Sequence, residues 1–167
     1  MAQLRRRCSH PEIFPYFATP NVELQTVAES VELAAPAEEV WSLIGQFNID
    51  WHPLVARVRL TGSGSGQLRA IQTVDGKEIV ERLEEIDHEK RFYRYTLVAG
   101  IAASPYTGVL EVKRQGNATR SRCLATWRVD FLASNQPAIV VRDQISRLLR
   151  TGLEGLRARF ALAAGTK

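Results

Sequence analysis

Glu81 is the residue whose position in this sequence most strongly suggests a chemical role. In the stretch IVERLEE, residues 79–85, strand alternation places Glu81 on the same side as Ile79 and Leu83. If that apolar side faces the interior, the carboxylate of Glu81 is buried with it. Burial raises the pKa of a carboxyl group. Such a group can transfer protons, or it can orient the polar end of a ligand.

Arg69, on the preceding predicted strand, offers a purely structural alternative. An inward Arg69 would pair with Glu81, and the ion pair would close the floor of an interior cavity. The sequence leaves both roles of Glu81 open.

His52 is the other candidate for acid or base chemistry, because an imidazole changes charge near neutral pH. It lies in the tripeptide WHP, and no nucleophile or orienting acid is near it in the sequence. We expect His52 to stabilise a turn together with Trp51 and Pro53, and we keep it as a catalytic candidate beside Glu81. No cluster of His, Cys and acidic residues has metal-ligand spacing, so no metal and no cofactor is predicted.

The composition indicates one ordinary globular domain. The chain has 167 residues and a formal net charge of +4, and this length is enough to bury a sizeable core. Cys8 and Cys123 are too few for a disulfide framework, which favours a cytoplasmic location. The basic residues are scattered or, near the C-terminus, spaced as the solvated face of a helix. Nucleic-acid binding is therefore not expected, and a homodimer is left open.

The first 20 residues differ from the rest of the chain. They include three consecutive arginines and three prolines, and they have no apolar stretch long enough for a signal peptide or a membrane helix. We interpret residues 1–20 as an extended N-terminal arm, followed by a single domain over residues 21–163. Neither export nor integral membrane association is expected.

Apolar periodicity predicts the order of elements. A strand at 24–35 precedes a short amphipathic helix at 36–47, which has Pro36 at its first position and acidic residues in its first turn. Six strands then follow, at 54–62, 67–74, 77–87, 91–100, 106–115 and 118–133. The Gly/Ser loop 62–66, the dipeptide Asp75-Gly76 and the tripeptide QGN are predicted hairpin connections. Asp75-Gly76 is expected to form a two-residue turn with both residues at positive φ.

From Pro137 onward, apolar residues recur at helical spacing for more than six turns. The fold class is therefore α+β, with a curved seven-stranded antiparallel sheet around a long C-terminal helix. A single helix covers only part of such a sheet, so the sheet should curl. A gap between the curved sheet and the helix would be a candidate pocket.

These elements and several short motifs resemble the START/polyketide-cyclase superfamily, also called SRPBCC or birch-pollen-allergen-like. The motifs are APAEEVWSLIGQF, WHP, ERLEEID, YRYTLVAG, a PY that opens a strand, and ATWRVDF. The resemblance covers residues 24–161 and is strongest to the polyketide cyclase/dehydrase and lipid transport branch. It implies the helix-grip fold. The gate and latch motifs of the more distantly similar abscisic-acid receptors are replaced by TVDGKE and IAASP, so hormone sensing by that mechanism is not expected.

The resemblance also implies a deep cavity for a small apolar or amphipathic molecule. Glu81, with Arg69, would hold the polar end of the ligand, and further residues would clasp its body: Tyr93, Tyr95, Leu97, Tyr106 and Trp127. Gly152 interrupts the apolar stripe of the long helix, either to make room for a ligand or to allow close contact with a strand. This hypothesis requires a cavity larger than a few water molecules.

Two other functions are compatible with the sequence. One is an enzyme, a polyketide cyclase or dehydratase that uses Glu81 as general acid or base. The other is an interaction module without a ligand, which a large exposed apolar patch would favour.

Overall fold

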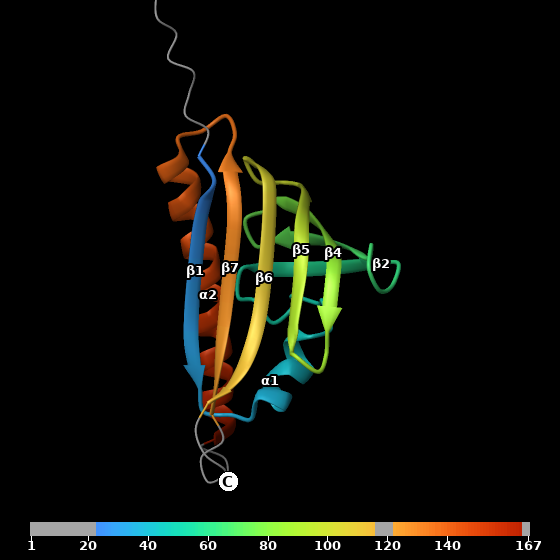
Figure 1. Cartoon of the computed structure of the whole chain (residues 1–167), viewed down its shortest axis with the longest axis vertical. Coiled ribbons are helices and arrows are strands. Elements are labelled where there is room, and N and C mark those ends of the chain that lie inside the picture. The colour runs from blue at the N-terminus through green and yellow to red at the C-terminus, as the bar shows by residue number, and fades with distance from the viewer. Residues whose placement is uncertain (1–22, 116–121, 165–167) are drawn as a thin grey trace, which may run out of the picture.

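A computed structural model describes residues 23–115 and 122–164 of the chain, so the predicted arm at 1–20 lies outside the described residues. The elements follow in the order β1 (Gln25–Leu33), α1 (Ala37–Ile44), β2 (Val55–Thr61), β3 (Leu68–Thr73), β4 (Glu78–Asp87), β5 (Phe92–Ala99), β6 (Ala103–Gln115), β7 (Arg122–Ala133) and α2 (Ala138–Ala164). The strands form one antiparallel sheet in the order β1-β7-β6-β5-β4-β3-β2 (Figure 1).

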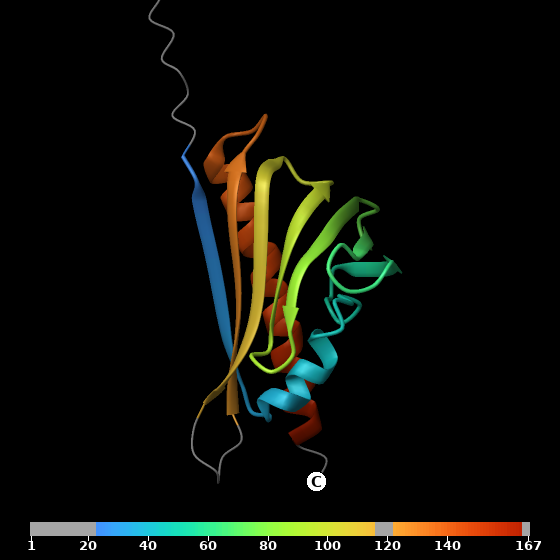
Figure 2. The same ribbon diagram turned by 45° about the vertical axis from the view of Figure 1, so that its right-hand side comes forward.

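The predicted helix-grip arrangement is confirmed. The sheet curves, and α2 lies along its concave face behind β1 and β7 (Figures 1 and 2). The stripe of α2 that faces the sheet is buried at Val141, Ile145, Leu149, Leu153 and Leu156. The arginines on the opposite side of α2 are exposed, as the periodicity predicts. No helix in the described part of the chain is both long and apolar enough to cross a membrane.

Helix α1 is shorter than predicted because it ends at Ile44 instead of residue 47. Pro36 is its N-cap and has extended backbone angles, φ −60° and ψ 142°. A Cβ at Gly45 would lie 2.5 Å from the indole ring of Trp41, so close packing with that ring requires glycine there. Phe47 follows with φ 53°, in the left-handed region that ends a helix and that bulky residues rarely adopt.

The hairpin between β3 and β4 is confirmed, but its predicted turn type is wrong. Only Gly76 has a positive φ, of 82°. The N–H of Gly76 donates to the carbonyl of Thr73, and the N–H of Thr73 donates to the carbonyl of Lys77, each at 2.9 Å. The loop therefore has three residues with glycine at the left-handed position, a common alternative to the two-residue turn. The predicted QGN turn extends into residues 116–121, outside the described residues.

Candidate functional site

Arg69 and Glu81 form a buried ion pair on the inner face of the sheet. The register of β3 and β4 places them directly opposite one another. Arg69 Nε donates to Glu81 Oε2 at 2.5 Å, and the two side chains are 0% and 5% exposed. The predicted inward orientation of Glu81 is confirmed, and the structure contains the ion pair that was its structural alternative.

Aromatic rings surround the guanidinium group of Arg69. Its central carbon lies 4.2 Å from the ring centroid of Phe47, 4.7 Å from that of Tyr95 and 5.6 Å from that of Tyr93. Arg69 Nη1 donates to the carbonyl of Phe47 and to the hydroxyl of Tyr93, both at 3.4 Å. The faces of the rings attract the cation and offset part of the cost of burying it.

Burial and pairing act in opposite directions on this ion pair. Burial raises the pKa of Glu81 above its ordinary value, and the charge and hydrogen bond of Arg69 oppose this shift. Burial also lowers the pKa of Arg69, but Glu81, Tyr93 and Tyr95 together more than offset this effect, so the pKa of Arg69 is raised and the group stays charged. Within residues 23–115 and 122–164, Arg69 Nη2 is buried without a hydrogen-bond partner.

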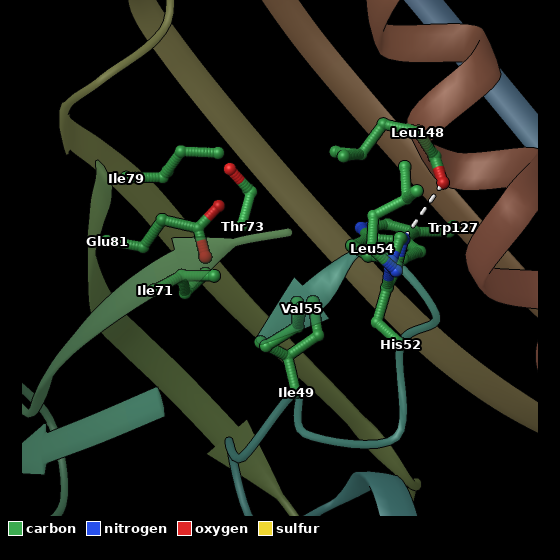
Figure 3. Close-up of a pocket in the computed structure, with 10 residues that line it drawn as sticks. All are labelled: Ile49, His52, Leu54, Val55, Ile71, Thr73, Ile79, Glu81, Trp127 and Leu148. Atoms are coloured by element: carbon green, nitrogen blue, oxygen red, sulfur yellow. Dashed lines mark hydrogen bonds between the residues drawn. The ribbon is translucent and has the colours of Figure 1, made fainter. Parts of the chain in front are cut away.

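A small cavity lies beside Glu81, between the sheet and α2 (Figure 3). Its lining is mostly apolar: Ile49, His52, Leu54, Val55, Ile71, Thr73, Ile79, Glu81, Trp127 and Leu148. The cavity volume is about 20 Å³, which is room for about one water molecule. Ligand pockets usually have roughly 300–1,000 Å³. The expectation of a deep, ligand-sized cavity is therefore wrong for this structure, and the size that the ligand-binding hypothesis required is not reached.

Residues 47–54, which we call the plug segment, explain why the interior is full. They connect α1 to β2 and send four side chains inward: Phe47, Ile49, Trp51 and His52, all 8% exposed or less. The sequence predicted Phe47 as the last residue of the helix and a turn after it, and it did not place Ile49 and Trp51 inside. The run FNIDWHP contains three large apolar residues, and that density was the available signal that the turn is buried.

His52 fastens the plug segment to α2. Its Nε2 bonds to the carbonyl of Leu148 at 3.1 Å, and its Nδ1 accepts the N–H of Leu54 at 3.0 Å (Figure 3). These partners require a neutral ring with its proton on Nε2. Burial lowers the pKa of His52, and the charge of Arg69 lowers it further, whereas the Leu148 carbonyl opposes the shift. Both ring nitrogens are engaged, so His52 stabilises the turn here and has no nitrogen available to a substrate.

Gly152 is explained by close contact. A Cβ at Gly152 would lie 2.5 Å from His52 Cδ2 and 3.0 Å from Trp127 Cζ3. A Cβ at Gly155, one turn later, would lie 2.7 Å from Pro53. Because neither glycine has a side chain, the plug segment can pack closely against α2 at these two positions. Of the two explanations that the sequence left open for Gly152, this structure supports packing.

The tyrosines and Trp127 form the wall behind the ion pair. Tyr93, Tyr95, Tyr106 and Trp127 are at most 2% exposed. Trp127 Nε1 donates to the hydroxyl of Tyr95 at 2.9 Å. The hydroxyl of Tyr106 is buried without a hydrogen-bond partner among the described residues. Leu97 is only half-buried.

The predicted site residues therefore separate into three groups. Glu81, His52 and Trp127 line the cavity. Arg69 is the partner of Glu81 in the ion pair, and Tyr93 and Tyr95 lie against its guanidinium. The remaining candidates, Tyr106, Leu97 and Gly152, do not line the cavity. In the part of the chain that the structure describes, no three His, Cys, Asp or Glu side chains gather as metal ligands would.

The curved sheet that grips a long helix is the fold of the SRPBCC, birch-pollen-allergen-like class. Residues 25–161 match the family model described as polyketide cyclase / dehydrase and lipid transport, and the chain belongs to this family. No curated protein matches the chain significantly.

Solved structures agree with the family. The protein XoxI from Bacillus cereus is 27% identical with a TM-score of 0.76, and the alignment covers 81% of this chain and 95% of that one. A protein from Thermobifida fusca is 32% identical with a TM-score of 0.72, covering 81% and 92%. Norcoclaurine synthase from Thalictrum flavum is 17% identical with a TM-score of 0.67, covering 87% and 97%, and shares the fold alone.

Proposed function

We propose that the protein binds a small amphipathic molecule between the sheet and α2, beside Glu81. One observation carries the proposal: a buried ion pair beside a small apolar cavity, in which Arg69 Nη2 has no hydrogen-bond partner in the described chain. A buried polar group without a hydrogen bond costs about 1–3 kcal/mol. A ligand that accepts a hydrogen bond from Arg69 Nη2 recovers part of that free energy.

Binding requires the plug segment to move, because the cavity accommodates about one water molecule. Three hydrogen bonds connect this segment to more distant residues of the described chain. His52 bonds to α2, Arg69 Nη1 donates to the carbonyl of Phe47 at 3.4 Å, and the carbonyl of Leu54 accepts the N–H of Val74 at 2.9 Å. Outward movement of Ile49 and Trp51 would enlarge the cavity toward the ion pair. In this proposal the apolar walls hold the body of the ligand, and Glu81 and Arg69 hold its polar end.

The family supports a ligand-binding role without naming the ligand. The cytoplasmic location and the lack of nucleic-acid binding stay predictions, and the homodimer stays open.

Native mass spectrometry of the protein, purified gently from its own host, tests this proposal. We expect a stoichiometric organic compound that can be extracted and identified. Its affinity should then be compared between Glu81→Gln and Glu84→Gln, since Glu84 lies on the outer side of the same strand. We expect at least a tenfold change in Kd for Glu81→Gln, provided that the compound donates a hydrogen bond, and none for Glu84→Gln. Equal affinities in the two variants would place the compound elsewhere and contradict the proposal.

An enzyme is the second candidate function. The observation in its favour is that burial raises the pKa of Glu81, as a general acid at neutral pH requires. Norcoclaurine synthase, a synthase by name, has the same fold. In this case Glu81→Gln should abolish turnover of a polyketide-like or aromatic substrate while binding persists. A carrier would turn over no such substrate, even in the wild type.

A further inference from the structure

A second cavity lies on the outside of the molecule, where α1 ends. It is an open groove of about 290 Å³ between the end of α1, the loop at 62–66 and strand β4. Its lining residues are Gly45, Gln46, Phe47, Gly64, Gln67, Leu83, Ile86 and His88, none of which lines the interior cavity. The volume is near the lower end for small-molecule sites and suits a molecule of one or two rings.

The floor of this groove is apolar and firmly supported. Phe47 and Leu83 are 1% exposed, and Ile86 packs against the core beside them. Phe47 is fixed by Arg69, because the guanidinium lies 4.2 Å from its ring centroid and bonds to its carbonyl. Phe47 and Leu83 close the bottom of the groove, and half-buried Ile86 offers the apolar surface that a planar ring could contact without any rearrangement of the interior.

His88 supplies a hydrogen-bond donor at the rim. Trp41 Nε1 donates to His88 Nδ1 at 3.2 Å. An indole nitrogen can only donate, so Nδ1 must be unprotonated and the proton of the neutral ring is on Nε2. The His88 side chain is exposed and lines the groove. It therefore offers the Nε2–H group to a ligand.

Two amide side chains supply acceptors at the same rim. Gln46 Nε2 donates to the carbonyl of Ser42 at 3.4 Å, and Gln67 Nε2 donates to the carbonyl of Gly62 at 3.0 Å. These bonds use the amide nitrogens, and neither amide oxygen has a partner within residues 23–115 and 122–164. The groove thus combines an apolar floor with one donor and two acceptors. No Lys, Arg, Asp or Glu lines it.

We propose that this groove is a binding site for a small, uncharged, planar molecule that carries hydroxyl groups. The hydroxyls donate to the amide oxygens of Gln46 and Gln67 and accept from His88 Nε2, while the ring lies against Ile86 in the groove that Phe47 and Leu83 close from below. A charged ligand is disfavoured because the lining has no opposite charge to replace its lost hydration. The site is separate from the interior cavity and does not depend on the function proposed above.

The three tryptophans allow groove binding and interior binding to be measured apart. Trp41 bonds to His88 at the groove, whereas Trp127 lines the interior cavity and Trp51 belongs to the plug segment. The ¹⁵N-labelled full chain should be titrated with 2-naphthol, and its indole N–H resonances followed by NMR at pH 7. We expect a saturable shift of the Trp41 resonance and none at Trp127. A shift at Trp127 or Trp51 with none at Trp41 would overturn the groove proposal and would leave the interior proposal standing.

Two loop glycines provide a matched pair of variants. Gly64 and Gly66 have φ of 64° and 89°, and a Cβ at either would meet no atom within 4 Å, but only Gly64 lines the groove. Asn tolerates this backbone region better than most residues. We expect Gly64→Asn to weaken 2-naphthol binding at least fivefold and Gly66→Asn to leave it unchanged. Equal affinity in both variants, or equally tight binding of charged 2-naphthoate, would contradict the proposal.

Discussion

Replacing Arg69 with Met should expose the energetic cost of the buried carboxylate. Met keeps a long unbranched side chain in the same place but removes the guanidinium. Glu81 then loses its hydrogen-bond donor while staying on the buried face of β4. Removal of one partner of a buried ion pair costs about 3–5 kcal/mol. Because domains of this kind are stable by about 5–15 kcal/mol, Arg69→Met should fold in the cold with a much lower urea midpoint.

The loss of stability in Arg69→Met should depend on pH in a defined direction. Burial raises the pKa of Glu81, and in this variant no cation opposes the shift. A carboxyl group with a raised pKa in the folded state is protonated in both states below its ordinary pKa of 4.5. As pH rises through the folded-state pKa, the unfolded state ionises more easily and the folded state loses stability. The difference in free energy of unfolding between the variant and the wild type should therefore be smallest below pH 4.5 and largest at neutral pH.

Urea unfolding followed by circular dichroism at several pH values measures this loss. The control is Arg69→Met/Glu81→Gln, which removes both charges. It should recover at least half of the stability that the single variant loses at pH 7, and the difference between the two should shrink toward pH 4. A double variant as unstable as Arg69→Met, at every pH, would show that lost packing around Phe47 is the cause. It would refute the argument from an uncompensated charge.

Three further predictions concern the contacts around the plug segment and the core. Gly152→Ala should lower the free energy of unfolding by roughly 1–3 kcal/mol, because the new Cβ would lie 2.5 Å from His52. This loss should exceed the gain from the better helix propensity of Ala. Thermal melting measures it, and an unchanged Tm would contradict the prediction. The pKa of His52 is lowered from 6.5, so stability should fall as pH drops below 6.5, and His52→Gln should remove that dependence in urea titrations. Burial raises the pKa of Cys123 to about 11, so in a Cys8→Ser background a thiol reagent should react with Cys123 only at the rate of unfolding.

The sequence predicted the position of Glu81 because alternation along a strand is local and needs no knowledge of distant residues. The hydrophobic stripe of α2 was predictable for the same reason. The contents of the interior were not. Whether Ile49 and Trp51 fill the space beside Glu81 depends on how the chain leaves α1, and Phe47 makes that exit with a positive φ that its residue type does not suggest. A resemblance to proteins with deep cavities therefore gave the right architecture and the wrong volume.

Phe47 connects the two proposed sites, and this connection has a measurable consequence. One part of its environment is the outer groove, and another is the guanidinium of Arg69. The groove has this lining only while Phe47 is in place, so a ring bound there favours the closed position of the plug segment. A molecule bound beside Glu81 requires that segment to move. Linkage then demands that each ligand weaken the binding of the other by the same factor. A titration of the interior compound with and without saturating 2-naphthol should show this reciprocal loss of affinity, and independent affinities would mean that the plug segment does not move when the interior is occupied.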